Sequence, residues 1–262
     1  MRRALIGHTG FVGSTLARRG EFTDFFNSSN FRDLRNQRFD EVVCAGISAV
    51  KWLANKEPEA DWTKIRELLD VLSNIKTSRF TLISTIDVYP DASQPLDERC
   101  ELMPDDGQPY GRHRREVELF VMRQFEEAMI ARLPALFGTG LKKNVIFDLL
   151  TGNQVDRINP SAAFQWYPLK RLGADLELAR KAGLKLVNLF PEPLATAAIL
   201  KRLFPDALVG EPSDPAPHYR LRTVHADIFG GTSPYLMPAD AVMADLECFV
   251  DSARLAPARE LG

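Results

Sequence analysis

Three glycines near the amino end of the chain have the spacing of a phosphate-binding turn. Gly7, Gly10 and Gly13 follow the apolar run Ala4-Leu5-Ile6 and precede a helix-like segment. Such glycines allow a tight turn, a close approach of the backbone to a pyrophosphate, and close packing of the helix on the strand. The amide groups that begin the helix then attract the phosphates. We therefore expect a bound dinucleotide; a glycine-rich turn without a ligand is the alternative.

The residues at the end of the second expected strand bear on which dinucleotide is bound. Asn27 stands where an NAD site usually carries Asp or Glu for the ribose 2′-hydroxyl. Ser28, Ser29 and Arg32 follow, and hydroxyl groups with an arginine suit a 2′-phosphate. These residues favour NADP over NAD. The alternative is that Asn27 binds the NAD ribose and that Arg32 and its neighbour Arg35 face solvent.

Two motifs farther along the chain resemble those of a known enzyme family. A strand-like run leads into Ser84-Thr85-Ile86-Asp87-Val88-Tyr89, and a loop separates it from Pro109-Tyr110-Gly111-Arg112-His113-Arg114. These motifs are similar to S-[ST]-x-x-V-Y-G and P-Y-G-x-S-K of the extended short-chain dehydrogenase/reductase superfamily. Within it they resemble the NAD-dependent epimerase/dehydratase family, which acts on nucleotide sugars. Residues 132–138 and 164–172 continue the likeness.

The resemblance implies roles for individual residues. Tyr110 would be the catalytic tyrosine, which shuttles a hydroxyl proton during hydride transfer, and Thr85 would hydrogen-bond the developing oxyanion. Thr85, Asp87 and Asn144 are the residues expected to contact the substrate. Those expected to contact the cofactor are Gly7, Thr9, Gly10, Phe11, Val12, Gly13, Asn27, Ser28, Arg32, Ala45, Gly46, Tyr110, Arg114 and Pro134.

Arg114 departs from the family pattern, which has a lysine at this place. A tyrosine has a pKa near 10, so it is a poor base at neutral pH unless a cation stabilises its phenolate. Arg114 follows Tyr110 by one helical turn, so both side chains should face the nicotinamide ribose. A unit charge about 4 Å away at an effective dielectric constant of about 20 is worth roughly 4 kcal/mol. We expect Arg114 to lower the pKa of Tyr110 by up to about 3 units and to complete the catalytic set.

Asp87 bears on the type of reaction. Dehydratases of the superfamily carry an acid two residues before the tyrosine of the V-Y pair, and often a second acid next to it. Asp87 occupies the first of these positions, but Ile86 stands where the second acid would be. The incomplete pair favours a binding or structural role for Asp87.

The expected elements alternate along the chain. Strands are expected over residues 4–6, 24–28, 41–45, 79–84, 130–136 and 184–189, and helices over 14–19, 61–75, 110–129, 172–182, 194–204 and 240–254. Asn30 and Asp240 are expected to cap helices. The alternation predicts a doubly wound parallel sheet, an α/β Rossmann fold. We expect residues 1–140 to form the dinucleotide-binding domain, with returning segments around 164–182. Residues 141–262 would form a smaller, interleaved substrate-binding region.

Composition excludes several other classes of protein. The net charge of −2 gives no field that would hold nucleic acid or an anionic membrane. The three cysteines and four histidines are scattered, which argues against a disulfide framework and a metal site. No run reaches the ~20 apolar residues of a membrane helix, and the amino end lacks a signal-like segment. We expect a cytoplasmic protein whose partner is a small molecule, with a homodimer as a further possibility.

Three functions remain open at this level. The first is an enzyme that oxidises, reduces or epimerises a nucleotide sugar with NADP or NAD. The second is a non-catalytic NADP-binding sensor or scaffold of the same fold, which the arginine at position 114 favours. The third is a reductase of a non-sugar carbonyl, because the fold does not determine the substrate.

Overall fold

A computed structural model describes residues 1–103, 105–232 and 234–255, and these fall into two units. The first unit comprises Met1–Asp91, Arg99–Leu133 and Leu172–Asn188. The second comprises Ala92–Glu98, Pro134–Arg171 and the described residues after Asn188. Residues 92–98, which were expected in the dinucleotide-binding domain, therefore belong to the second unit. The later segment that returns to the first unit is 172–188.

A six-stranded sheet forms the centre of the first unit. Its order is β2-β1-β3-β4-β5-β9, and every neighbouring pair is parallel. The strands are β1 (Arg3–Ile6), β2 (Asp24–Phe26), β3 (Arg38–Cys44), β4 (Lys76–Thr85), β5 (Ala128–Leu133) and β9 (Leu186–Asn188). The expected doubly wound α/β fold is confirmed. After β2 the chain crosses to the other side of β1, so the strand order reverses between β1 and β3, where such sheets bind their ligands.

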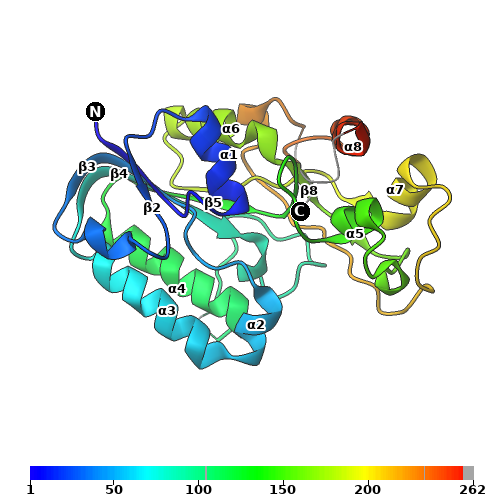
Figure 1. The fold of residues 1–262 in the computed structure, drawn as a ribbon, viewed down its shortest axis with the longest axis horizontal. Coiled ribbons are helices and arrows are strands. Elements are labelled where there is room, and N and C mark those ends of the chain that lie inside the picture. Colours follow the sequence, from blue (N-terminus) through cyan, green and yellow to red (C-terminus); the bar gives the residue numbers. More distant parts are fainter. Residues whose placement is uncertain (104, 233, 256–262) are drawn as a thin grey trace. The chain divides into compact units, whose positions relative to one another are not determined.

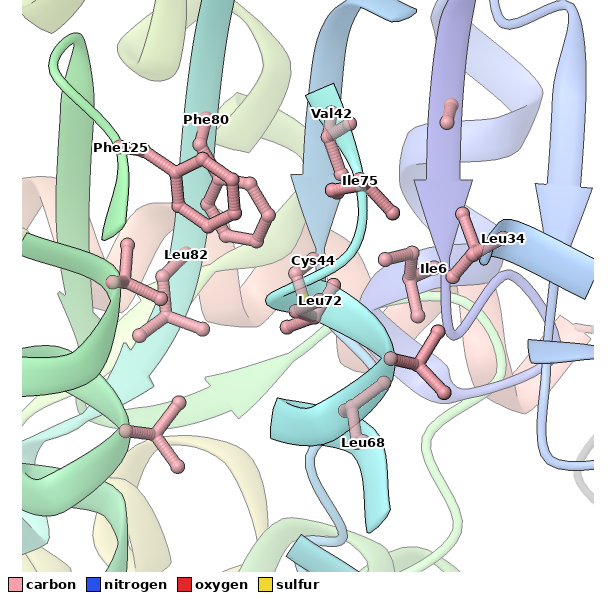
Figure 2. Close-up of a cluster of buried hydrophobic side chains, with 14 of the residues drawn as sticks. Ile6, Leu34, Val42, Cys44, Leu68, Leu72, Ile75, Phe80, Leu82 and Phe125 are labelled. Carbon is pink, nitrogen blue, oxygen red and sulfur yellow. The ribbon is translucent and has the colours of Figure 1, made fainter. Parts of the chain in front are cut away.

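Helices cover both faces of this sheet (Figure 1). Helices α1 (Phe11–Arg19) and α6 (Leu172–Lys181) lie on one face, and α2 (Lys51–Lys56), α3 (Pro58–Leu72) and α4 (Pro109–Gln124) lie on the other. Figure 2 shows Leu68 and Leu72 of α3 beside Ile6 and Cys44 of the sheet. This apolar layer fixes the face of the sheet on which α2, α3 and α4 lie.

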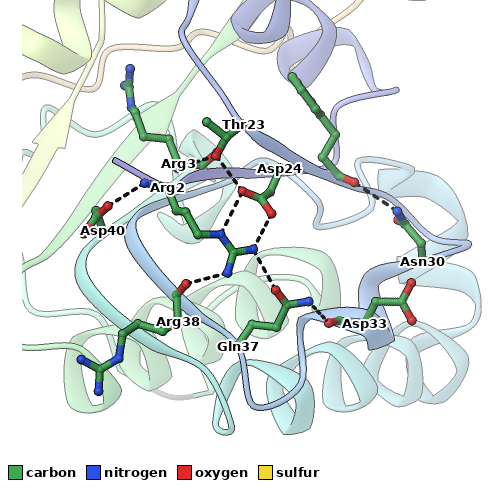
Figure 3. Close-up of polar contacts among 10 residues, drawn as sticks. Arg2, Arg3, Thr23, Asp24, Asn30, Asp33, Gln37, Arg38 and Asp40 are labelled. Atoms are coloured by element: carbon green, nitrogen blue, oxygen red, sulfur yellow. Dashed lines mark hydrogen bonds and ion pairs between the residues drawn. The ribbon is translucent and has the colours of Figure 1, made fainter.

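A polar cluster at the amino ends of the strands is structural (Figure 3). Arg2 donates to Asp24 Oδ1 at 2.5 Å, to Gln37 Oε1 at 2.9 Å and to the Arg38 carbonyl at 3.1 Å. These contacts join the beginnings of β1, β2 and β3. Since the glycine turn follows the carboxyl end of β1, the cluster lies at the opposite edge of the sheet.

The second unit contains two small sheets and three helices among its described residues. Strand β6 (Ala135–Phe137) pairs in parallel with β8 (Trp166–Pro168), and β7 (Ala163–Phe164) pairs antiparallel with β10 (Leu194–Ala195). The helices are α5 (Val145–Thr151), α7 (Thr196–Leu203) and α8 (Ala239–Leu255). Short 3-10 turns complete the chain: η1 (Phe31–Leu34), η2 (Ile86–Val88), η3 (Val155–Arg157), η4 (Leu169–Arg171) and η5 (Ala226–Phe229). Across both units, none of the described helices has the length and hydropathy to cross a bilayer.

Several predicted elements differ from those observed. The strand expected over 130–136 is two strands, because Pro134 lacks the N–H that a continuous ladder requires. The helix expected to reach residue 129 ends at Gln124, after which Phe125 turns inward and stacks on Phe80 with ring centroids 4.2 Å apart. The helix α2 was not predicted.

The two predicted helix caps are wrong. Asn30 precedes η1 without capping it; its Oδ1 accepts from the Asn27 N–H and its Nδ2 donates to the Phe25 carbonyl. Asp240 lies inside α8, which begins at Ala239, and accepts from the N–H of the next residue. In both cases the side chain bonds a neighbouring backbone group, which short polar side chains do readily.

Candidate functional site

The glycine turn joins β1 to α1 at the switch point of the sheet. Gly7 has a φ of +87°, and a Cβ there would lie 2.5 Å from the Ala45 carbonyl oxygen, at the end of β3. A Cβ on Gly13 would overlap the Gly7 carbonyl, so this glycine lets α1 pack closely on β1. Both glycines are therefore required by the protein's own packing.

Gly10 is different, because the protein itself leaves room for a side chain there. It is exposed, its φ is −77°, and a Cβ would meet only the Gly7 carbonyl oxygen, at 3.4 Å. Among the described residues, no side chain caps the N-terminus of α1. The packing of the protein itself does not require a glycine at position 10. A glycine in front of uncapped helix amides fits a pyrophosphate that approaches the backbone.

The other residues expected at the dinucleotide lie around the same strand ends. Thr9 is exposed, and Phe11 and Val12 are half-buried in the first turn of α1. Ala45 and Gly46 follow β3, and a Cβ on Gly46 would lie 2.8 Å from Ile6. All these residues belong to the first unit.

The residues expected to choose between NAD and NADP are engaged with other groups. Asn27 Oδ1 accepts from the Ser29 N–H at 2.8 Å and from the Ser29 hydroxyl at 2.6 Å. Ser28, between these two residues in the chain, is exposed. Arg32 pairs with Glu67 of α3 at 2.6 Å, and Arg35 pairs with Asp70 at 2.5 Å. Both ion pairs are exposed, and such pairs are worth only about 0–1 kcal/mol, so a phosphate dianion can compete for either arginine.

Tyr110 and Thr85 lie together, as their motifs predicted. Thr85 ends β4 and Tyr110 stands in the first turn of α4, and Thr85 is near enough to lower the pKa of the Tyr110 phenol. Only 6% of Tyr110 is exposed. Gly111 makes the approach feasible, because a Cβ there would overlap the Asp87 carbonyl. The backbone of Tyr110 is held by Asn55 of α2, whose Oδ1 accepts its N–H at 2.9 Å.

Arg114 is buried in an ion pair that the sequence did not predict. It donates to both oxygens of Asp61 in α3, at 2.6 and 3.1 Å, and also to the carbonyls of Ser48 and Tyr110. His113 contacts the same carboxylate at 2.8 Å. The Arg114 guanidinium carbon lies 3.9 Å from the centre of the Tyr110 ring, and the residue is 3% exposed. Its charge is thus compensated by Asp61.

Arg114 lowers the pKa of Tyr110 as expected, but the expected net acidification does not occur. Burial raises the pKa of the Tyr110 phenol above its usual value, and Arg114 offsets this only in part. Asp87 raises this pKa further, whereas Lys51 and Thr85 lower it. The cation at position 114 can be read from the sequence, whereas the burial of the phenol cannot.

Asp87 lies between Thr85 and a lysine that the sequence analysis missed. Its Oδ2 accepts from the Thr85 hydroxyl at 3.1 Å, and its Oδ1 accepts from Lys51 Nζ at 2.5 Å. Lys51 belongs to the unpredicted helix α2. Ile86, in the place of a second acid, is buried.

A buried network holds the elements that carry these groups, and it too was missed. Glu118 of α4 accepts from Arg132 of β5 at 2.7 and 2.9 Å and from the Ser84 hydroxyl at 2.6 Å. The Tyr89 hydroxyl accepts from Arg132 at 2.9 Å and from Asn188 at 2.7 Å. The network ties α4, which carries Tyr110, to the strand that ends at Thr85. No motif or spacing in the sequence indicates that Glu118 of α4 pairs with Arg132 of β5.

Two predicted site residues lie in the second unit. Pro134 follows β5. Asn144 has a φ of +118° and caps α5, where its Oδ1 accepts from the N–H groups of Ile146 and Phe147. Its Nδ2 donates to the Leu136 carbonyl at 2.9 Å. The side chain of Asn144 therefore has a structural role. Its contact with a substrate stays a prediction.

Known proteins share this fold. No curated protein matches the sequence. Among solved structures, dTDP-4-dehydrorhamnose reductase from Clostridium acetobutylicum has a TM-score of 0.73 at 14% identity, over 97% of this chain and 100% of that one. UDP-glucose 4-epimerase from Thermotoga maritima has a TM-score of 0.72 at 14% identity, over 97% and 99%. An NAD-dependent NDP-hexosamine 5,6-dehydratase of tunicamycin biosynthesis has a TM-score of 0.73 at 18% identity, over 99% and 100%. At these identities the likeness establishes the fold alone.

The sequence itself matches a family profile over more than half of its length. The match covers residues 19–155 and is to the NAD dependent epimerase/dehydratase family. That range contains Thr85, Tyr110 and the strands and helices that position them. The chain belongs to the NAD-dependent epimerase/dehydratase family, as its two motifs predicted.

Proposed function

We propose that this chain is an NAD(P)-dependent oxidoreductase or epimerase that acts on a nucleotide sugar, with Tyr110 as its acid–base group. The joint position of Tyr110 and Thr85 carries this proposal. The close packing of Gly111 on the Asp87 backbone brings them together at the sheet edge from which the glycine turn also starts. A bound nicotinamide supplies the donor or acceptor of hydride. The chain's own task is to move one proton to or from the substrate oxygen.

The observed contacts suit that task. The buried Tyr110 hydroxyl keeps its proton at neutral pH, so it can donate it to an oxygen that gains negative charge. Thr85, at the end of β4, supplies the second hydroxyl group for the same oxygen, once it releases the proton that it donates to Asp87 Oδ2. Arg114, stacked on the Tyr110 ring and fixed by Asp61, keeps the ring in place.

The substrate class rests on the solved structures of similar fold. The reductase, the epimerase and the dehydratase named above each act on a sugar joined to a nucleotide, by their own descriptions. Dehydration is the least favoured of the three reactions for this chain. Asp87 forms an ion pair with Lys51. The buried Ile86 occupies the position where dehydratases carry a second acid.

A non-catalytic NADP-binding sensor is the second candidate, and the Arg114–Asp61 pair favours it. The family's lysine presents an ammonium to the ribose, whereas the terminal N–H groups of Arg114 donate to Asp61, Ser48 and Tyr110. A site that binds the cofactor but lacks that ammonium would suit a protein that reports the cofactor without turning it over.

Turnover across a panel of substrates separates the two candidates. UDP-hexoses and dTDP-4-keto sugars are incubated with NAD or NADP in both redox states; nicotinamide absorbance reports net redox and NMR of the sugars reports epimerisation. We expect turnover by the wild type, and a loss of at least about 100-fold in Tyr110→Phe with cofactor affinity retained. Tyr235→Phe, which removes the same hydroxyl elsewhere, is the matched control. Turnover that ignores Tyr110→Phe would refute the proposal, and cofactor binding without turnover of any panel member would favour the sensor.

Two finer expectations also belong to this proposal. We expect a cytoplasmic location, because the three cysteines are scattered along the sequence without the spacing of a disulfide framework. A homodimer is a prediction that sedimentation of the purified protein at several concentrations will test.

A further inference from the structure

A line of contacts joins the start of α4, which carries Tyr110, to the amine of Lys51. Gly111 lies against the Asp87 backbone, the Thr85 hydroxyl donates to Asp87 Oδ2 at 3.1 Å, and Lys51 Nζ donates to Asp87 Oδ1 at 2.5 Å. The Lys51 side chain is 48% exposed. The helix that carries the acid–base tyrosine is thus linked, through Asp87, to a cation at the surface.

The helix that carries Lys51 is fixed to the helix that carries Tyr110. Asn55 follows Lys51 by four residues, so both lie on the same face of α2. Asn55 accepts the Tyr110 N–H at 2.9 Å. The contact that sets the start of α4 therefore also sets the position of Lys51 relative to Asp87.

Arg114 compensates only part of the effect of burial on the tyrosine hydroxyl. Its guanidinium lies over the face of the Tyr110 ring, and both of its terminal nitrogens donate to Asp61. His113 approaches the same carboxylate. Among the described residues, Lys51 and Asp87 also act on the Tyr110 hydroxyl, and this pair adjoins Thr85.

Without Lys51, Asp87 would oppose the chemistry of Tyr110 through its charge. A negative charge nearby disfavours a phenolate. The Thr85 hydroxyl donates its single proton to Asp87 with Lys51 in place, so Asp87 keeps this contact in either case. An ammonium on the other carboxylate oxygen offsets the charge of Asp87.

We propose that Lys51 is a positioning residue for catalysis: by holding Asp87, it offsets the negative charge beside Tyr110 and so adds, from α2, to the compensation that Arg114 supplies only in part. The inference rests on the proposed acid–base role of Tyr110. It assigns to the chain a cation outside the motif of tyrosine and lysine on one helix. The pair of Lys51 and Asp87 then shifts the ionisation of Tyr110.

The test measures the ionisation of Tyr110 without any substrate. The chain has five tyrosines, and fluorotyrosine incorporation gives five fluorine NMR signals, of which Tyr110→Phe removes one and so identifies it. Fluorotyrosine is more acidic than tyrosine, which brings the titration into a range where folding can be checked by circular dichroism. Lys51→Met should raise the pKa of residue 110 by roughly one unit, because it leaves Asp87 uncompensated. Asp87→Asn should lower it, and the double variant should return it toward the wild-type value.

Matched controls keep the result interpretable. Lys56→Met removes an exposed lysine from the other end of α2 and should leave the titration unchanged, whereas Lys51→Arg should restore it. Equal titrations for Lys51→Met and Lys56→Met would overturn the inference, as would a rise caused by Asp87→Asn. Where turnover is found, Lys51→Met should move its pH profile by the same amount and lower kcat more than it raises KM. A titration that responds to Lys51 in a protein that turns over no substrate would refute the hydride-transfer function and support the pair's control of Tyr110.

Discussion

Gly111 lies directly against the backbone of Asp87, so closely that a Cβ on Gly111 would overlap the Asp87 carbonyl oxygen. The contact brings the first turn of α4 onto η2 and thereby sets Tyr110 beside Thr85. Any side chain at position 111 must push the two elements apart.

Gly111→Ala should therefore destabilise the fold and disturb the site together. Overpacking of this kind costs typically about 1–3 kcal/mol, and we expect a lower urea midpoint together with loss of turnover. Gly173→Ala is the control, since a Cβ there has open space within α6 and should stabilise the helix by roughly 0.5–1 kcal/mol. Equal effects of the two substitutions would show that the contact between α4 and η2 is loose.

The Glu118–Arg132 pair should dominate the stability of the region behind Tyr110. Both side chains are almost fully buried, and removal of one partner leaves a buried charge without compensation. Glu118→Gln should cost about 3–5 kcal/mol in the free energy of unfolding. Glu116→Gln, on the same helix, should change it by less than about 0.5 kcal/mol. Chemical denaturation of both variants measures the difference, and a cost below about 1 kcal/mol for Glu118→Gln would contradict the assigned network.

Asp61 should make stability depend on pH in the acid range. Burial opposes its ionisation, but hydrogen bonds from Arg114 and His113 outweigh burial and hold the pKa of Asp61 below its usual value. A carboxylate with a depressed pKa contributes stability that is complete above its unfolded pKa of about 4 and is lost as the pH falls through the folded pKa. Urea midpoints measured from neutral pH to about pH 3 should show this loss in the wild type and in Arg112→Met. The loss should be smaller in Arg114→Met, and an equal slope in all three proteins would contradict the role of the pair.

Asn27 should set the preference between NADP and NAD. Asn27→Asp keeps the acceptor that the Ser29 amide uses, and it adds a carboxylate that binds a ribose 2′-hydroxyl and repels a 2′-phosphate. Calorimetric titrations should show tighter binding of NADP by the wild type and a shift toward NAD in the variant. Asn74→Asp, a charge change that precedes β4 at the opposite edge of the sheet, should leave both affinities unchanged. Tighter binding of NAD by the wild type would mean that Arg32 and Arg35 serve only their pairs with α3.

The sequence predicted what depends on local pattern. The parallel sheet follows from the alternation of apolar runs, and the joint position of Thr85 and Tyr110 follows from motifs that end a strand and begin a helix. Partners far apart in sequence left no such pattern. Asp61 lies 53 residues before Arg114, and Lys51 lies 36 residues before Asp87, so neither ion pair could be foreseen. The raised pKa of Tyr110 was missed for the same reason, because burial depends on how the whole unit packs.

The central claim is that the dinucleotide binds at the glycine turn beside Tyr110, and one titration tests it most directly. Fluorotyrosine-labelled protein is titrated with NADPH and with NADH while the assigned signal of residue 110 is followed by NMR. We expect this signal to shift on saturation in the wild type and in Gly173→Val. In Gly10→Val, whose side chain the fold accommodates but a pyrophosphate would not, it should stay unchanged. Two results would contradict binding of the dinucleotide at the glycine turn beside Tyr110. One is a wild-type signal that does not shift with either nucleotide, and the other is a Gly10→Val protein that binds them as tightly as the wild type.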